Sequence, residues 1–243
     1  MSRIVPLKRL VRAALMMGAL HVAATPARAE VLLFQNFDDV TALAGWTQTN
    51  NSDPGGATGW FQGNEGVFPS ESGAPDSYIA ANFLNAGAGA ISNWLILPEL
   101  SFFNGDSLSF FTRSSGFLPD RLEVRFSAGA GADVGANAAS VGSFTTLFLT
   151  LNPALNDGGY PSDWTQYTVN LAALDGLSGR LAFRYNIDTN LVNGDYIGID
   201  TVSVNRVPEP GTLVLMGLGL AGLLAKRRRQ AAGGTPFVQQ RGA

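Results

Sequence analysis

The alternation of apolar and polar residues along short segments is the feature that most constrains how this chain can fold. In 121–127 (RLEVRFS) a leucine, a valine and a phenylalanine alternate with two arginines and a glutamate. A strand turns successive side chains to opposite faces, so this pattern predicts one buried face and one face in water. The same period recurs in 180–187 (RLAFRYNI) and in 107–113 (SLSFFTR).

Other segments complete a set of roughly nine to eleven short strands, because they are rich in β-branched and aromatic residues and are bounded by turn residues. They are 31–37, 77–83, 93–98, 143–150, 164–171 and 195–204. No stretch between residues 30 and 206 sustains a helical period, and there is no length for helices between parallel strands. The pattern therefore predicts an all-β fold, an antiparallel jelly-roll β-sandwich, spanning 30–206.

Residues 1–29 have the order of a secretory signal peptide. Basic residues come first, an apolar run follows over 13–24, and Ala27 and Ala29 precede the expected cut before Glu30. An amphipathic or buried N-terminal helix is the alternative. The sandwich is therefore expected to be exported.

The composition of the expected mature domain excludes several functions. Between 30 and 206 there are 18 acidic residues, six arginines and no lysine, a net charge of −12 that disfavours nucleic-acid binding. The chain has no cysteine, and its single histidine, His21, lies in the signal peptide. A Ser-His-Asp hydrolase, a histidine-liganded zinc site and thiol chemistry are thereby excluded, and we expect no enzyme. A glycan-cleaving enzyme built on paired carboxylates stays the least favoured alternative.

Two tryptophans are candidates for ligand binding. Trp46 and Trp60 flank the polar, glycine-containing segment 47–59, where their rings could line a sugar-binding surface. Packing that anchors the loop is the competing interpretation. Trp94 and Trp164 are expected in the core.

Carboxylate, amide and carbonyl oxygens could bind calcium, which needs neither histidine nor cysteine ligands. Asp38 follows the first predicted strand, and Asp200 lies in the last one, where the alternation changes phase and predicts a bulge near Thr201. If the first and last strands pair, Asp38 and Asp200 could meet and hold a structural Ca2+. The alternative is that Asp38 and Asp39 cap a turn and Asp200 makes a local hydrogen bond.

The C-terminal segment has the order of a membrane anchor. Residues 212–225 carry no charge and are followed by a basic cluster, Lys226, Arg227, Arg228 and Arg229. A helix of this length reaches only about 21 Å, short of the roughly 30 Å of a bilayer core. We expect a single short transmembrane helix over 212–225, with the basic cluster cytoplasmic, the sandwich outside and 230–243 a disordered tail.

The same residues resemble a known sorting signal. Val207, Pro208, Glu209 and Pro210, then an apolar helix, then the basic cluster, look like the PEP-CTERM signal over 207–229. The resemblance implies an exosortase-type processing enzyme and the export machinery as partners. It also implies a precursor held in the inner membrane facing the periplasm, and later a cell-surface or extracellular-matrix location.

The sandwich has a second resemblance. Segments 34–50, 59–65, 92–113, 120–127 and 196–204 resemble the choice-of-anchor J domain. That family is similar to cleaved-adhesin and MAM-like jelly rolls of concanavalin-like architecture, and related sandwiches imply calcium at positions matching Asp38 and Asp200. We therefore expect a non-enzymatic adhesion or matrix-associated module, with a carbohydrate-binding, lectin-like module as the alternative. Exopolysaccharide or surface glycans are the expected partners, met by loops such as 50–59.

Overall fold

The computed structural model describes residues 29–207, 216–217, 219–224 and 227–228. The expected signal peptide up to residue 28, Pro208, Glu209 and Pro210, Lys226 and Arg229, and the expected tail 230–243 lie outside the described residues. Residues Ala29–Pro208 form one compact unit.

Thirteen strands and three short 3-10 helices lie between residues 30 and 206. The strands are β1 (Glu30–Gln35), β2 (Thr47–Asn50), β3 (Asp53–Gly55), β4 (Phe61–Gln62), β5 (Ile79–Asn82), β6 (Ala86–Ile96), β7 (Leu100–Ser101), β8 (Asp106–Ser114), β9 (Leu122–Ala128), β10 (Thr146–Leu151), β11 (Thr165–Asn170), β12 (Ser178–Ile187) and β13 (Tyr196–Arg206). The 3-10 helices are η1 (Val40–Ala42), η2 (Phe83–Asn85) and η3 (Ala172–Leu174).

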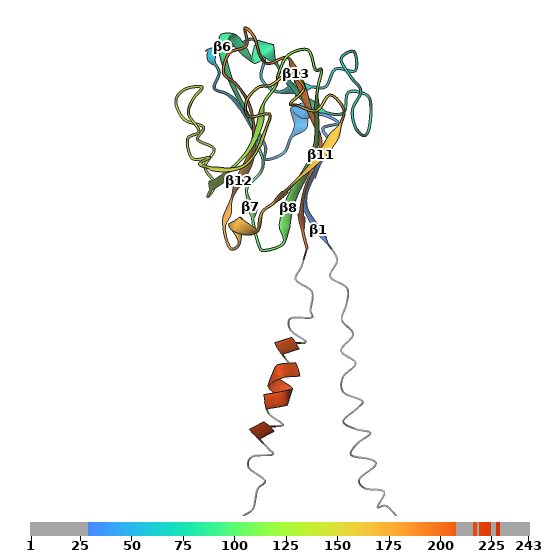
Figure 1. Cartoon of the computed structure of the whole chain (residues 1–243), viewed down its shortest axis with the longest axis vertical. Helices are drawn as coiled ribbons and strands as arrows, with labels where there is room; N and C mark the ends of the chain where they lie inside the picture. Colours follow the sequence, from blue (N-terminus) through green and yellow to red (C-terminus); the bar gives the residue numbers. More distant parts are fainter. Residues whose placement is uncertain (1–28, 208–215, 218, 225–226, 229–243) are drawn as a thin grey trace, which may run out of the picture. The chain divides into compact units, whose positions relative to one another are not determined.

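The strands form two antiparallel sheets packed face to face (Figure 1). The first, sheet A, has the order β11-β8-β13-β5-β4, with β1 also paired to β13. The second, sheet B, has the order β10-β9-β12-β6-β2, with β7 on β12 and β3 on β6. The predicted all-β antiparallel sandwich is therefore confirmed.

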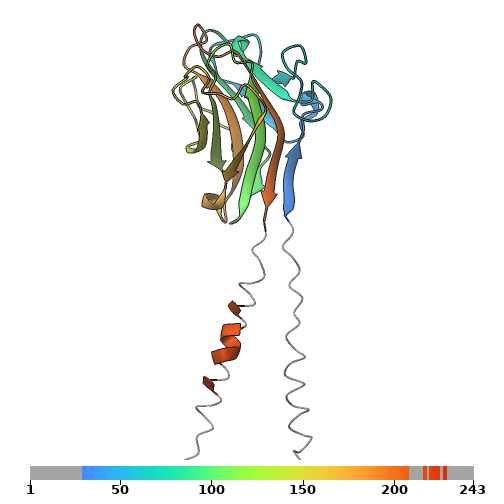
Figure 2. The same ribbon diagram turned by 45° about the vertical axis from the view of Figure 1, so that its right-hand side comes forward.

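The first and last strands lie side by side, which meets the condition for Asp38 and Asp200 to lie near each other (Figure 2). Glu30 pairs with Arg206, and the register between β13 and β8 shifts between Asp200 and Ser203. Thr201 at this bulge has φ +49°. The change of phase in the sequence therefore located the bulge correctly.

Every predicted strand is present, but β2, β3, β4 and β7 were not predicted. They are only two to four residues long, which is too short for a period-two alternation to be recognised in the sequence. Their hydrogen bonds come from neighbours already in the sheets, chiefly β6. Such strands are decided by tertiary pairing rather than by local sequence.

The core between the sheets is built from the predicted inward residues. Phe110 of β8 and Phe183 of β12 meet edge to face with ring centroids 4.8 Å apart, and both are fully buried. Leu122, Val124 and Phe126 of β9 are buried beside them. The predicted apolar face thus lies in the core.

The prediction that the polar faces of β9 and β12 lie in water is wrong for part of these strands, because some of their charged side chains are buried. Segment 129–145 packs over the outer face of sheet B, where its Val134 and Phe144 cover Trp94, Ile96 and Ala182. Glu123 is 7% exposed and Arg184 is 3% exposed. The alternation reports which face points away from the core, but a glycine- and alanine-rich loop from elsewhere in the chain can still cover that face.

The C-terminal segment is helical at its described residues, 216–217, 219–224 and 227–228. Among the described residues, none of the helices has the length and apolar character needed to cross a membrane. The transmembrane anchor therefore stays a prediction.

Candidate functional site

The two ends of the sandwich differ, and the strand register defines them. Glu30 and Arg206 pair with each other, and Arg206 also pairs with Asp106 at the start of β8; we call this the tail end. Ser114, at the other end of β8, pairs with Ile197 at the start of β13; we call this the loop end. The nine residues of β8 separate the two ends by about 26 Å.

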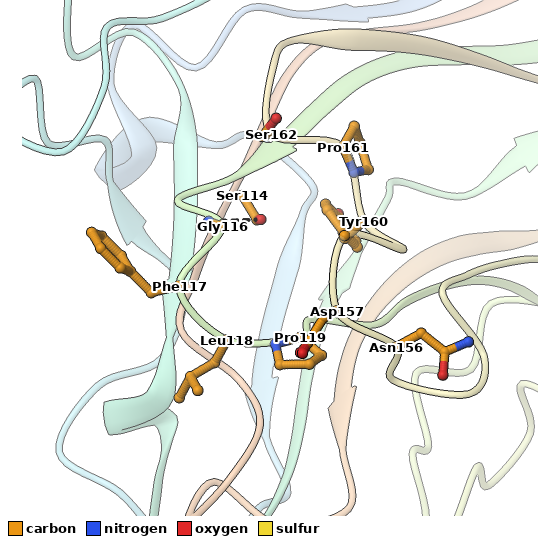
Figure 3. Close-up of a pocket in the computed structure, with 11 residues that line it drawn as sticks. Ser114, Gly116, Phe117, Leu118, Pro119, Asn156, Asp157, Tyr160, Pro161 and Ser162 are labelled. Carbon is orange, nitrogen blue, oxygen red and sulfur yellow. Dashed lines mark hydrogen bonds between the residues drawn. The ribbon is translucent and has the colours of Figure 1, made fainter.

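A pocket of about 600 Å³ opens at the loop end, between the β8–β9 loop and the β10–β11 loop (Figure 3). The backbone N–H of Ser114 donates to the carbonyl of Pro161 (2.8 Å), which joins the two loops. The lining residues are Ser114, Gly116, Phe117, Leu118, Pro119, Asn156, Asp157, Gly158, Tyr160, Pro161 and Ser162. The pocket thus combines apolar surface with hydroxyl, amide and carboxylate groups.

Asn152 fixes the shape of the pocket. Its Nδ2 donates to the carbonyl oxygens of Asp120 (3.0 Å) and Asn156 (2.9 Å), and its Oδ1 accepts from the Asn156 N–H (2.9 Å). Asn152 is buried and has φ +51°, a left-handed conformation that asparagine tolerates better than most residues. One side chain therefore holds both walls of the pocket, so the cavity is formed without a ligand.

Asp120 lies directly behind the pocket wall and is fully buried. Its Oδ1 accepts from the Tyr185 hydroxyl (2.6 Å) and from the Asp195 N–H (2.9 Å). Burial raises the pKa of this carboxyl to about 7, against the lowering effect of those hydrogen bonds. Asp120 thus ties β12 and the β12–β13 loop to the pocket.

Phe117 is the most exposed large apolar residue of the sandwich, at 87%. Figure 3 shows its ring directed outward at the rim, across the opening from Tyr160 and Pro161. The Tyr160 hydroxyl is held at 2.6 Å from Thr112 Oγ1, so Tyr160 forms the inner wall. Sequence reasoning missed this site; an aromatic residue in the loop sequence GFLP was the only signal for it.

Asp38 and Asp200 both contact the segment 70–77. Asp38 Oδ1 accepts from the Ser77 hydroxyl (2.9 Å). Asp200 Oδ2 accepts from the N–H groups of Glu71 (2.9 Å) and Ser72 (3.1 Å), and Oδ1 accepts from the Thr201 N–H (2.6 Å). The structure therefore brings the two aspartates to one loop, which they hold in place.

This arrangement resembles a loop clamp more than an assembled calcium site. Both oxygens of Asp200 face N–H donors, whereas calcium needs several oxygens converging on one point. No group of three or more acidic or histidine side chains in the described part of the chain is placed to hold a metal. Burial raises the pKa of Asp200 to about 6, and the nearby Glu71 carboxylate adds to this. Calcium at Asp38 and Asp200 stays a prediction.

The two candidate tryptophans are packed. Trp60 is 5% exposed and belongs to the main core, so it offers no open ring face. Trp46 is half-buried and packs edge to face on Phe37, with ring centroids 5.6 Å apart. Trp60 therefore anchors the segment it flanks, and a ligand-binding role for Trp46 stays a prediction.

Among Val207, Pro208, Glu209 and Pro210, the structure describes only Val207. In the basic cluster it describes Arg227 and Arg228, which are helical and exposed. Residues 206–229 match the PEP-CTERM protein-sorting motif. The motif begins at the last residue of β13, and it marks the chain as an exported, surface-associated protein.

The sandwich is similar to solved structures of adhesin domains. The K1 cleaved adhesin domain of Lys-gingipain from Porphyromonas gingivalis W83 is 22% identical, with a TM-score of 0.51, covering 74% of this chain and 98% of that one. The K3 cleaved adhesin domain of the same protein is 20% identical, with a TM-score of 0.49, covering 73% and 100%.

A family 22 carbohydrate-binding module of Clostridium thermocellum Xyn10B is more distant, at 11% identity and a TM-score of 0.43, covering 73% and 94%. A search of curated proteins found no significant match. The predicted cleaved-adhesin likeness and the PEP-CTERM signal are confirmed, while the choice-of-anchor J assignment stays a prediction. The chain is thus a sandwich of cleaved-adhesin fold followed by a PEP-CTERM sorting motif.

Proposed function

We propose that this chain is an exported, non-enzymatic adhesion or matrix-associated module. Its tail holds it transiently at the inner membrane, an exosortase-type enzyme processes it near Pro208, Glu209 and Pro210, and the sandwich is then displayed at the cell surface or in the extracellular matrix. The observation that carries the proposal is the PEP-CTERM match, which begins where β13 ends, so the sorting signal follows directly on a complete sandwich.

The charge distribution supports different roles for the sandwich and for the sorting motif. The sandwich carries −12 and no lysine, which suits a soluble module displayed outside the cell. Four basic residues, Lys226 to Arg229, lie together in the motif, where they act as a membrane-stop cluster. Cleavage ahead of the cluster would release an acidic domain.

Mass spectrometry of the surface-released protein tests the processing. We expect a C-terminus between Pro208 and Gly211, and we expect that alanine at Pro208, Glu209 and Pro210 abolishes release while deletion of 230–243 does not. Recovery of intact Lys226 to Arg229 in surface material would refute processing. Immunolabelling of whole cells that finds no surface protein would refute display.

Carbohydrate binding is the second candidate function, and the loop-end pocket favours it. A cavity of about 600 Å³ with an exposed ring and several polar groups has the size and chemistry of ligand sites. Catalysis is less favoured, because Asp157 is the single carboxylate lining this pocket and glycoside hydrolysis by this route needs two. Turnover of glycans by the purified sandwich would reverse that order.

A further inference from the structure

We propose that the loop-end pocket binds a neutral oligosaccharide, at the end of the sandwich opposite Arg206. The inference rests on the proposed function as a surface recognition module, and it names the site and the ligand class. It is carried by the pocket's lining, by its preformed shape and by its position in the fold.

One broad surface of the fold, the outer face of sheet B, is covered. On the outer face of sheet B, segment 129–145 covers Trp94, and the Ala138 carbonyl accepts from Arg184 beneath it. Asn51 Nδ2 fastens the same segment by donating to the carbonyls of Gly135 (3.2 Å) and Asn137 (2.8 Å). A glycan chain therefore cannot lie on this face without displacing a well-bonded loop.

The lining of the pocket selects the ligand by charge. It holds no lysine, arginine or histidine, and it includes the exposed carboxylate of Asp157. Phosphate, sulfate and uronate groups would meet negative charge there without a cationic partner. Arg113, next to Ser114 in β8, donates to the Ser162 carbonyl, and its guanidinium carbon lies 4.4 Å from the centre of the Phe68 ring.

The remaining groups suit a sugar. The exposed amide of Asn156, the hydroxyl of Ser162 and the Asp157 carboxylate can exchange hydrogen bonds with ligand hydroxyls. Phe117 provides a flat apolar surface at the rim for the C–H face of a second sugar ring. A neutral, hydroxyl-rich ligand longer than one sugar residue matches both the polar lining and the aromatic ring at the rim.

The pocket is already shaped before any ligand binds. Asn152 joins both walls, and the Gly194 N–H donates to the Pro119 carbonyl (2.8 Å) from a third loop. A preformed site loses little conformational entropy on binding, which favours affinity for a small ligand. The site also lies about 26 Å from the tail end of the sandwich, where Arg206 begins the sorting motif.

Binding measurements on the purified sandwich, residues 30–206, test the proposal. An array carrying neutral xylo-, galacto-, manno- and gluco-oligosaccharides beside heparin and polygalacturonate would be screened first, and the best neutral ligand measured by titration calorimetry. We expect neutral ligands to bind in preference to acidic ones. Phe117→Ala is expected to weaken that binding by about tenfold or more, because it removes an aromatic contact.

Matched controls separate the pocket from the rest of the loop end. Leu191→Ala removes an apolar side chain that is 71% exposed and lies outside the lining, and it should leave the affinity unchanged. Asp157→Asn should weaken binding several-fold, whereas Asp163→Asn, also exposed and outside the lining, should not.

Three results would overturn the proposal: no neutral ligand bound, binding of acidic glycans alone, or equal affinity of Phe117→Ala and the unmodified sandwich. Any of these results with normal surface labelling would refute glycan binding in the pocket but not display at the cell surface. Binding of neutral glycans by a protein that never reaches the surface would refute display but not glycan binding.

Discussion

Substituting Asp120 by asparagine should change how the stability of the sandwich depends on pH. Asp120 is fully buried, and burial raises its pKa to about 7 from the ordinary value of 3.8. The folded state therefore binds a proton that the unfolded state releases at lower pH. Between about pH 4 and 7 the folded state holds more protons, so the free energy of unfolding falls as the pH rises.

The size of this effect follows from the pKa. The full shift corresponds to about 4 kcal/mol, and the part lost between pH 5 and 8 is about 3 kcal/mol. Asparagine has nearly the same shape and keeps an oxygen that can accept from Tyr185 and Asp195, but it does not ionise. The variant should therefore lose this slope and be more stable than the unmodified sandwich at pH 8.

Thermal unfolding followed by circular dichroism at pH 5, 6, 7 and 8 measures the effect. The difference in Tm between variant and unmodified sandwich should grow by roughly 6–12 °C over this range. Asp200, whose pKa is also raised, is present in both proteins and cancels in the difference. Asp157→Asn, an exposed change, serves as the control. Parallel pH curves for Asp120→Asn and the unmodified sandwich would refute the reasoning.

Three further substitutions test the loop contacts. Asp200→Ala should lower the free energy of unfolding by about 2 kcal/mol in denaturant melts, because two loop N–H groups lose their acceptor. This loss should be the same in excess EDTA. A loss seen with calcium but not with EDTA would instead assign Asp200 to a metal site. Glu123→Gln should lower the free energy of unfolding by about 3 kcal/mol, because it leaves buried Arg184 without its carboxylate partner. It should also speed hydrogen exchange in segment 129–145, and unchanged exchange there would contradict the role given to this ion pair. Asn152→Ala should weaken binding in the loop-end pocket and cost about 2 kcal/mol, and retention of full affinity would show that the pocket does not depend on this residue.

Local patterns were enough to predict much of the fold. Alternation over 121–127 and 180–187 identified β9 and β12, because a strand with one buried face must place apolar residues at every second position. The break in that alternation near Asp200 predicted the bulge in β13 for the same reason. The sorting motif could also be read directly, because its order of proline, apolar run and basic cluster is linear.

The candidate site could be predicted only in part. The sequence indicated that Asp38 and Asp200 could meet if the first and last strands pair. Both side chains do hold segment 70–77, but the sequence could not show that N–H groups would occupy the Asp200 oxygens. Trp60 could have been either a surface ring or a packed anchor of its loop, and only the structure shows that its side chain lies in the core. Exposure of an aromatic residue in a loop depends on which distant strands pack beneath it.

The sequence by itself determined an exported, acidic, antiparallel β-sandwich without histidine or cysteine chemistry, because strand period, composition and targeting order are local properties. Only the tertiary structure decided that segment 129–145 would cover the outer face of sheet B and that the loops around Phe117 and Asn156 would enclose a pocket. Those features arise from contacts between segments far apart in the chain, such as the hydrogen bonds of Asn152 to Asp120 and of Asn51 to Gly135. No local pattern records such pairings, since each partner is an ordinary loop residue until the sheets bring them together.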